Sequence, residues 1–141
     1  MNIDSIKNGV VIDHITAGRG MRLYELLGLD SLDCSVALIR NVGSKKIGKK
    51  DIIKIDSAIT LNFDVIGFVD PDVTVNIIEN SVITEKRSID IPETLTNVVY
   101  CKNPRCITSV EQELDHVFRL TDRDEKVYRC IYCETKNPQI F

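Results

Sequence analysis

Four cysteines in the last third of the chain constrain its fold more than any other feature. They form two pairs, Cys101-x4-Cys106 and Cys130-x2-Cys133, with 23 residues between the pairs. Two such pairs on tight turns can direct four sulfur atoms at one point, the arrangement that tetrahedral zinc prefers. Because four thiolates leave no position open for water, the pattern predicts one structural Zn2+ ion. Two disulfide bonds are the alternative, and this spacing without an export signal favours the metal.

The charge of this cysteine module indicates which partner it can bind. From residue 97 to residue 141, seven basic side chains face seven acidic ones, and four thiolates with one zinc ion add −4 and +2. A phosphate backbone requires a positive surface, so we expect a protein partner and no nucleic acid. His116 could replace one cysteine as a ligand, but the spacing does not require it, and we expect an ordinary polar residue.

The cysteines also divide the chain into two parts. Cys34 stands alone before residue 100, and we expect it to be a small buried side chain. The polar stretch from Lys86 to Glu93 contains a proline, which predicts a connector with a boundary near Pro92. The predicted domains are therefore residues 1–92 and residues 93–141. With 141 residues, of which 43% are hydrophobic, the chain can bury two small cores.

Hydrophobic patterning predicts an α+β fold for the first domain. Short β-branched runs predict strands, and apolar residues at helical spacing before glycine predict a helix. The resulting order matches the split ferredoxin-like arrangement, in which two helices cover one face of an antiparallel sheet. A small β-rich zinc-binding domain would follow. The expected elements are a strand at 10–15, a helix at 22–27, strands at 35–39 and 51–56, a helix at 61–69, and strands at 73–78 and 82–84.

The basic stretch GSKKIGKK at residues 43–50 matches part of the phosphate-loop pattern G-x-x-x-x-G-K. A nucleotide hydrolase places Ser or Thr next, because that hydroxyl binds magnesium, but this chain has Lys50. A strand pattern follows where a phosphate loop requires a helix. We therefore predict the tip of a β-hairpin without hydrolase activity. Its lysines could meet phosphates, although charge alone is more typical of a solvated surface.

Asp13 and His14 interrupt an otherwise apolar strand. Strand alternation predicts that their side chains lie on opposite faces, and taken alone this pattern is more typical of an edge strand than of a binding site. The chain contains no grouping of serine, histidine and acid and no complete cofactor motif, so we expect no enzyme activity. No apolar run is long enough to cross a membrane and no secretory signal is apparent, which predicts a cytoplasmic protein without a membrane partner.

The segments VIDHI at 11–15, GKKDIIKI at 48–55 and TVN at 74–76, together with the four cysteines, carry a family resemblance. In combination they resemble the regulatory chain of aspartate carbamoyltransferase, an enzyme of pyrimidine biosynthesis. The resemblance extends over the whole chain. It implies a non-catalytic subunit that forms a homodimer, binds nucleotide effectors (CTP, ATP and possibly UTP) in its first domain, and holds the catalytic chains through its zinc domain. The alternative is a zinc-ribbon transcription regulator that senses a small ligand.

The resemblance also implies a nucleotide site. Ser81 departs from the family pattern, which has a tyrosine beside the base, so base selectivity stays open, and the segment from 56 to 72 is shortened. By analogy with the family, CTP is expected to favour the less active state of the enzyme, and ATP to oppose it. The residues matching polar contacts to the effector are Asp13, His14, Lys50, Lys54, Asn76 and Lys86, and those matching contacts around the base and ribose are Ile6, Val11 and Ile83.

Overall fold

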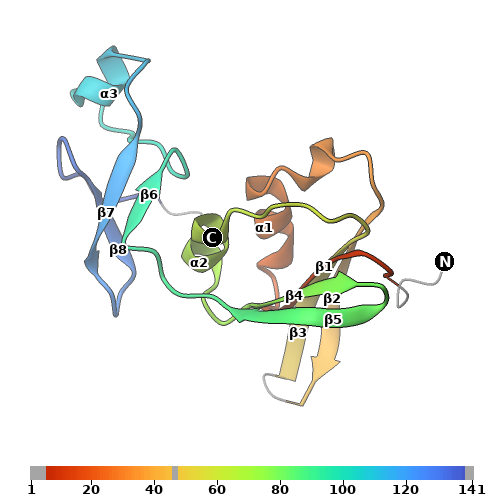
Figure 1. The fold of residues 1–141 in the computed structure, drawn as a ribbon. Coiled ribbons are helices and arrows are strands. Elements are labelled where there is room, and N and C mark those ends of the chain that lie inside the picture. The colour runs from red at the N-terminus through yellow and green to blue at the C-terminus, as the bar shows by residue number, and fades with distance from the viewer. Residues whose placement is uncertain (1–5, 46–47, 139–141) are drawn as a thin grey trace. The chain divides into compact units, whose positions relative to one another are not determined.

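The computed structural model describes residues 6–45 and 48–138. Contacts within the chain divide it into two compact units, residues 1–90 and residues 91–141, which are described separately. Figure 1 shows the course of the chain from one unit to the other. Among the described residues, no helix is both long and apolar enough to span a bilayer.

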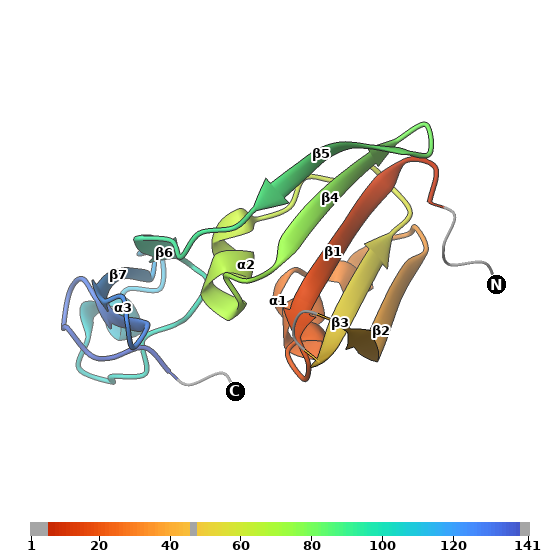
Figure 2. The same cartoon turned by 90° about the horizontal axis from the view of Figure 1, so that it is seen from below.

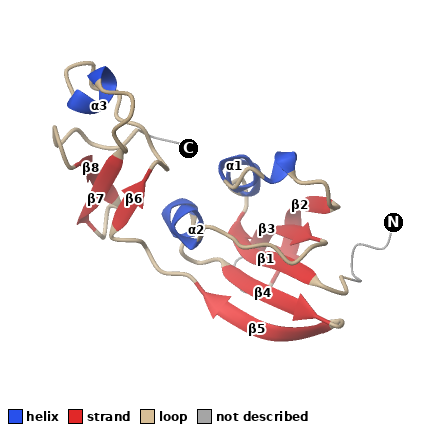
Figure 3. Cartoon of the chain, turned by 45° about the horizontal axis from the view of Figure 1, so that its top comes forward, coloured by secondary structure: helices blue, strands red, loops and turns tan. Residues whose placement is uncertain are grey.

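The first unit is an antiparallel five-stranded sheet with two α-helices, as the sequence predicted. The strand order is β2-β3-β1-β4-β5. Figures 2 and 3 show that both helices lie on the same face of this sheet. The elements are β1 (Gly9–Thr16), α1 (Gly20–Leu26), a 3-10 helix η1 (Leu29–Ser31), β2 (Val36–Ser44), β3 (Gly48–Ile55), α2 (Phe63–Val69), β4 (Thr74–Glu79) and β5 (Val82–Ser88).

The hydrophobic core lies between the sheet and the two helices. Ile12 pairs with Ile53 on β3 and with Val75 on β4, and all three side chains are buried. From the helices, Leu23 and Ile66 contribute fully buried side chains. The alternate residues of the same strands therefore point to the opposite face of the sheet, which we call the outer face.

Turn and cap residues set the ends of the helices. Gly28 has a φ of 67°, a left-handed conformation that glycine adopts without strain, just after α1. Before α2, the Asn62 side chain accepts hydrogen bonds from the backbone N–H groups of Asp64 at 3.1 Å and Val65 at 3.4 Å. This is the usual role of asparagine at a helix N-cap, and it explains why the helix begins at Phe63.

The basic stretch at residues 43–50 belongs to a β-hairpin. Strands β2 and β3 pair in antiparallel register from Val36 opposite Ile55 to Ser44 opposite Gly48. Lys49 and Lys50 therefore lie in a strand, not at the start of a helix, so the phosphate-loop interpretation is excluded by the fold. The tip residues Lys46 and Ile47 lie outside the described residues.

The predicted connector from Lys86 to Glu93 was wrong in its first part. Residues Lys86 to Ser88 belong to β5, which pairs with β4 up to Thr74 opposite Ser88. Every residue of β5 is exposed, so the strand lacks the alternating apolar pattern that sequence reasoning relies on. Pairing with β4 forms this strand despite its polar composition.

The second unit is a small three-stranded antiparallel sheet with one short helix. The strand order is β6-β7-β8, with β6 at Thr94–Thr96, β7 at Val117–Asp122 and β8 at Val127–Cys130. Helix α3 (Ile107–Val110) lies in the long connection between β6 and β7. Tyr128 and Phe118 fill the centre, and the Tyr128 hydroxyl donates to the Pro92 carbonyl at 2.5 Å.

Candidate functional site

The central residues of the predicted nucleotide site form one row across the outer face of the first domain. Lys54 on β3 pairs with Val11 on β1, Val11 pairs with Asn76 on β4, and Asn76 pairs with Lys86 on β5. Directly paired residues on neighbouring strands have side chains about 5 Å apart. Two lysines and an amide therefore lie in one row with an apolar side chain. The four residues come from four separate strands.

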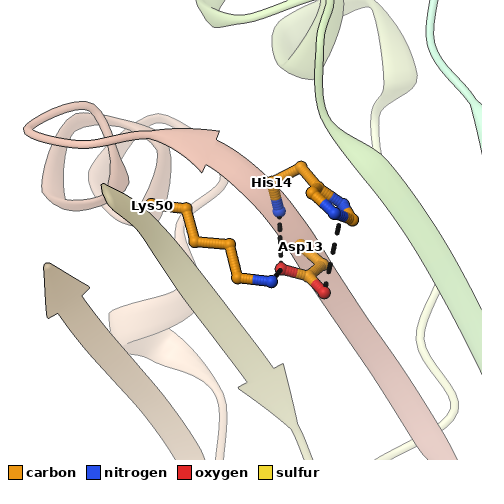
Figure 4. Close-up of polar contacts among 3 residues, drawn as sticks. All are labelled: Asp13, His14 and Lys50. Atoms are coloured by element: carbon orange, nitrogen blue, oxygen red, sulfur yellow. Dashed lines mark hydrogen bonds and ion pairs between the residues drawn. The ribbon is translucent and has the colours of Figure 1, made fainter. Parts of the chain in front are cut away.

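A charged group lies on one side of this row, farther along β1 and nearer the start of β3 (Figure 4). The Lys50 ammonium donates to Asp13 at 2.9 Å, and the backbone N–H of His14 donates to the same carboxylate at 2.6 Å. Burial acts to raise the pKa of Asp13, but the bonds from Lys50 and His14 outweigh it and lower this pKa below its usual value. Asp13 is therefore ionised at neutral pH and holds Lys50 in place.

The local geometry of Asp13 and His14 differs from the prediction. The pairing of β1 with β3 shifts by one residue between Ile12 and Ile15, and His14 has a φ of 61°. This β-bulge inserts one extra residue, so Asp13 and His14 are both half-buried between the core residues Ile12 and Ile15. Both side chains thus belong to the outer face, and β1 lies in the middle of the sheet, not at its edge.

Two buried polar atoms in this region have no hydrogen-bond partner among the described residues. They are Nδ1 of His14 and Oδ1 of Asn76. A buried polar atom without a partner costs roughly 1 to 3 kcal/mol, so such atoms are few in native structures and require an explanation. Both atoms are side-chain groups of predicted site residues, which favours a polar ligand above this part of the sheet.

The opposite side of the row is apolar. Ile83 on β5 is 55% exposed and pairs with Ile78 on β4, and Ile78 pairs with Gly9 at the start of β1. Ile6 lies three residues before β1, with its Cγ2 atom 2.8 Å from the point where a Cβ of Gly9 would stand. The nine predicted site residues therefore run from this apolar end, through the lysine and amide row, to the Asp13, His14 and Lys50 group.

The second domain brings its four cysteines together. Their sulfur atoms all lie within 4.8 Å of one another, with 3.5 Å between Cys101 and Cys133 and 3.7 Å between Cys106 and Cys130. Sulfur atoms that bind one zinc ion at about 2.3 Å in a tetrahedron are about 3.8 Å apart. The cluster therefore fits one metal ion, and four thiolates are the ligand set of a structural zinc site.

The cysteine thiols differ in acidity in this cluster. Burial raises the pKa of Cys101 to about 12, and the neighbouring thiols act in the same direction. Burial also acts to raise the pKa of Cys133, but the hydrogen bonds from the side chain and backbone of Thr135 outweigh it and lower this pKa to about 6. Since a metal binds thiolates, it must displace protons from the cluster, and its affinity falls at acid pH.

Polar residues around the cysteines support the cluster, and sequence reasoning missed most of them. The Thr108 hydroxyl donates to the Cys106 sulfur at 3.1 Å, and the hydroxyl oxygen of Thr135 lies 3.1 Å from the Cys133 sulfur. His116 is not among the clustered ligands; its Nδ1 accepts a hydrogen bond from the backbone N–H of Cys101 at 3.1 Å. The C-x-T spacing at Cys106 and Thr108 and again at Cys133 and Thr135 was the available signal, because a hydroxyl two residues after a cysteine can reach its sulfur.

Comparison with known proteins matches both domains to one family. The family model for the aspartate carbamoyltransferase regulatory chain, allosteric domain, matches residues 1–90, and that for the metal binding domain of the same chain matches residues 93–139. The chain belongs to the aspartate carbamoyltransferase regulatory chain family. It therefore consists of an allosteric domain followed by a metal-binding domain, and it belongs to an enzyme of pyrimidine biosynthesis.

Individual regulatory chains are similar over nearly their full length. The aspartate carbamoyltransferase regulatory chain of Clostridium botulinum strain Hall is 50% identical over 134 residues, covering 95% of this chain and 92% of that protein. That of Clostridium tetani is 49% identical over 135 residues, covering 95% and 94%, and that of Bifidobacterium longum is 40% identical over 134 residues, covering 95% and 96%. This membership favours the regulatory chain over the alternative of a transcription regulator.

Proposed function

We propose that this chain is the non-catalytic allosteric subunit of aspartate carbamoyltransferase, and that it binds nucleotide effectors on the outer face of its first sheet. The observation that carries the proposal is the row of Lys54, Asn76 and Lys86, together with the buried atoms Asn76 Oδ1 and His14 Nδ1, which have no hydrogen-bond partner among the described residues. Residues 1–92 would form the effector-binding domain. Residues 93–141 would form the zinc domain that contacts the catalytic chains.

The polarity of the outer face suggests how a nucleotide lies on it. Lysine and histidine side chains can neutralise a triphosphate, and they stand in the centre and at the Lys50 end of the site. The apolar end, with Ile6 and Ile83, suits a base and its ribose. Asn76 Oδ1 can accept a hydrogen bond from a sugar hydroxyl or a base amine. Lys50 would exchange part of its contact with Asp13 for phosphate.

Binding measurements on single variants test this site. Lys54→Ala and Lys86→Ala should each weaken the binding of CTP and ATP by about tenfold, because each removes a charge-assisted contact. Arg22→Ala is the matched control, since it removes a cation from the exposed surface of α1 on the helical side of the sheet. Isothermal titration with the zinc-loaded chain gives the affinities. Equal affinity in the wild type and both lysine variants would contradict the site.

The consequence for the enzyme follows from linkage. An effector shifts the assembly only if it binds the two quaternary states with different affinity, and the effect is reciprocal. By analogy with the family, CTP favours the less active state and ATP opposes it. An assay of the chain reconstituted with catalytic chains, at subsaturating aspartate, measures both effects, and activity that neither nucleotide alters would contradict the effector role. The chain alone should show no carbamoyltransferase activity.

Base selectivity is proposed to differ from that of the family because of Ser81. Asn80 and Ser81 both have positive φ values, 52° and 66°, and form the two-residue turn between β4 and β5. The Ser81 N–H donates to the Lys7 carbonyl at 2.8 Å, which holds this turn beside Ile6. A serine offers no ring to contact a base, so discrimination among CTP, ATP and UTP should be weak. Ser81→Tyr should increase it in the same titrations.

The assembly and location are proposed on the same basis. The family implies that the first domain forms a homodimer, and sedimentation of the zinc-loaded chain at increasing concentration measures its mass directly. A strictly monomeric chain at every concentration would contradict this. We also infer a cytoplasmic location, because a cluster of four cysteine ligands suits a reducing compartment.

A further inference from the structure

Three basic residues form a row across the sheet of the second domain. Arg119 on β7 pairs directly with Arg129 on β8, and Arg129 forms an antiparallel bridge with Lys136. All three side chains are exposed. Paired positions on neighbouring strands lie about 5 Å apart, and like charges placed directly opposite one another destabilise a sheet. The row therefore costs stability in the isolated chain, and an anionic partner would offset this cost.

The two arginines border a small hollow. Its volume is about 60 Å³, and it is lined by Arg119, Thr121, Arg129, Cys130, Ile131 and Glu134. Arg129 is oriented toward it in part by a hydrogen bond from Nη1 to the Glu134 carbonyl at 3.0 Å. Guanidinium groups bind carboxylates with two parallel hydrogen bonds, and a fixed guanidinium loses little entropy when it does so. The hollow is large enough for one carboxylate, and its two guanidinium groups leave a net positive charge beside the single acidic residue, Glu134.

The surroundings of the row favour a protein over a nucleic acid. Ile131 is 48% exposed beside the arginines, and Tyr132, 47% exposed, follows it in the sequence. Arginine together with exposed aromatic and aliphatic side chains is typical of protein interfaces. The module as a whole carries as many acidic as basic side chains, which gives a phosphate backbone no extended positive surface. A local basic row in a neutral domain instead suits a short acidic segment.

We propose that the row of Arg119, Arg129 and Lys136 binds an acidic surface of the catalytic chain, with one aspartate or glutamate side chain between the two arginines. This inference rests on the proposed contact between the zinc domain and the catalytic chains, and it names the chemistry of that contact. Electrostatic contacts of this kind raise the association rate and lose strength with added salt.

Charge reversal at the paired arginines tests the inference. The doubly substituted chain, Arg119→Glu with Arg129→Glu, should bind the catalytic subunit about tenfold more weakly or worse at about 50 mM salt, and its affinity should change little up to about 300 mM salt. The chain with Arg119→Lys and Arg129→Lys should retain most of the affinity, because it keeps both positive charges. It should lose only the part that comes from the paired hydrogen bonds of the guanidinium groups. Surface plasmon resonance with the full-length zinc-loaded chain gives both affinity and association rate.

Arg123→Glu is the matched control, because Arg123 is exposed on the β7–β8 turn outside the row and undergoes the same change of charge. It should bind within about twofold of the wild type. Zinc content and nucleotide affinity must stay at wild-type values in every variant, which excludes misfolding.

Wild-type affinity in the doubly reversed chain would overturn the inference and leave the proposed function intact. If the wild-type chain itself fails to bind the catalytic subunit, the proposed function is wrong. The inference would also be overturned if the charge-reversed chain lost affinity for duplex DNA but kept its affinity for the catalytic subunit.

Discussion

The two domains of this chain are stabilised in different ways. In the first, buried side chains from strands β1, β3 and β4 and from helices α1 and α2 pack into a continuous core, with Ile12, Ile53 and Ile66 fully enclosed. In the second, the buried hydrophobic residues other than cysteine are Leu95, Val99, Phe118 and Tyr128, as far as the described residues extend. A core this small supplies little stability by itself, so the metal cluster has to supply the rest. The first domain should therefore fold without metal, and the second domain should not.

Removal of the metal should have the largest effect. A structural zinc site contributes on the order of 10 kcal/mol to folding near neutral pH, far more than the small core of the second domain can replace. Chelation should therefore unfold the second domain and leave the first one native. Two-dimensional NMR spectra would show the amide signals of residues from about 97 onward collapsing, while those of β1 to β5 stay dispersed.

Cysteine variants test whether metal binding depends on the four clustered cysteines or on any cysteine of the chain. Cys106→Ser should lose the metal and reproduce the chelated spectrum. Cys34→Ser is the matched control, because Cys34 lies in the first domain, away from the cluster in the sequence, and is half-buried. It should retain one metal ion per chain. Dispersed signals from the second domain after complete metal removal would show that the contrast between the domains is wrong.

The sequence predicted the features of each domain that depend on local patterns, and it did not predict those that depend on strand pairing. The cysteine spacing and the short β-branched runs of β1, β3 and β4 predicted the metal cluster and the ferredoxin-like sheet, because each is a local pattern. The bulge at Asp13 and His14 could not be predicted, since it depends on the register of β1 against two neighbouring strands. The length of β5 was missed because all its residues are exposed. Pairing, and not composition, determines these two features.

A buried carboxylate in the first domain provides the next largest effect. Asp51 is fully buried, and its oxygens accept hydrogen bonds from the backbone N–H groups of Gly18 at 3.1 Å, Gly20 at 3.0 Å and Asn41 at 3.1 Å. Asp51→Asn replaces one accepting oxygen with a donor, so it should lower the free energy of unfolding by about 2 to 3 kcal/mol. Urea denaturation followed by circular dichroism measures this change.

Asp56→Asn is the control for Asp51→Asn, because it makes the same substitution at an exposed position just after β3, and it should change stability by less than about 0.5 kcal/mol. If the domains are stabilised separately, both variants keep a full complement of metal. A loss of metal in Asp51→Asn at a temperature where the first domain alone has melted would contradict that separation.

The ion pair between Asp13 and Lys50, in the proposed effector site, should give a smaller and pH-dependent effect. The pKa of Asp13 is lower in the folded chain than its usual value of 3.8, so the pair with Lys50 stabilises the fold above that pH. This stabilisation is lost as the pH falls through the folded-state pKa. Asp13→Asn should lower the free energy of unfolding by about 1 kcal/mol at pH 7, and this difference should shrink progressively as the pH falls below 3.8. Urea titrations over this pH range give the profile, and a deficit that stays constant with pH would show that the charge is not responsible.

The smallest effect is expected where the exposed strand β5 meets the helical side of the sheet. The guanidinium carbon of Arg87 lies 4.1 Å from the centroid of the Phe63 ring, a cation–π contact between β5 and α2. Phe63→Leu keeps an apolar side chain but removes the ring, so it should cost about 0.5 to 1 kcal/mol and speed hydrogen exchange of the β5 amides. Val82→Ala, at an exposed position of the same strand, is the control for β5 and should alter exchange little. Because Lys86 precedes Arg87, faster opening of β5 should also weaken nucleotide binding slightly, as the competent state is less populated. Unchanged exchange in Phe63→Leu would mean that pairing with β4 alone stabilises β5, and that the contact between Arg87 and Phe63 does not contribute.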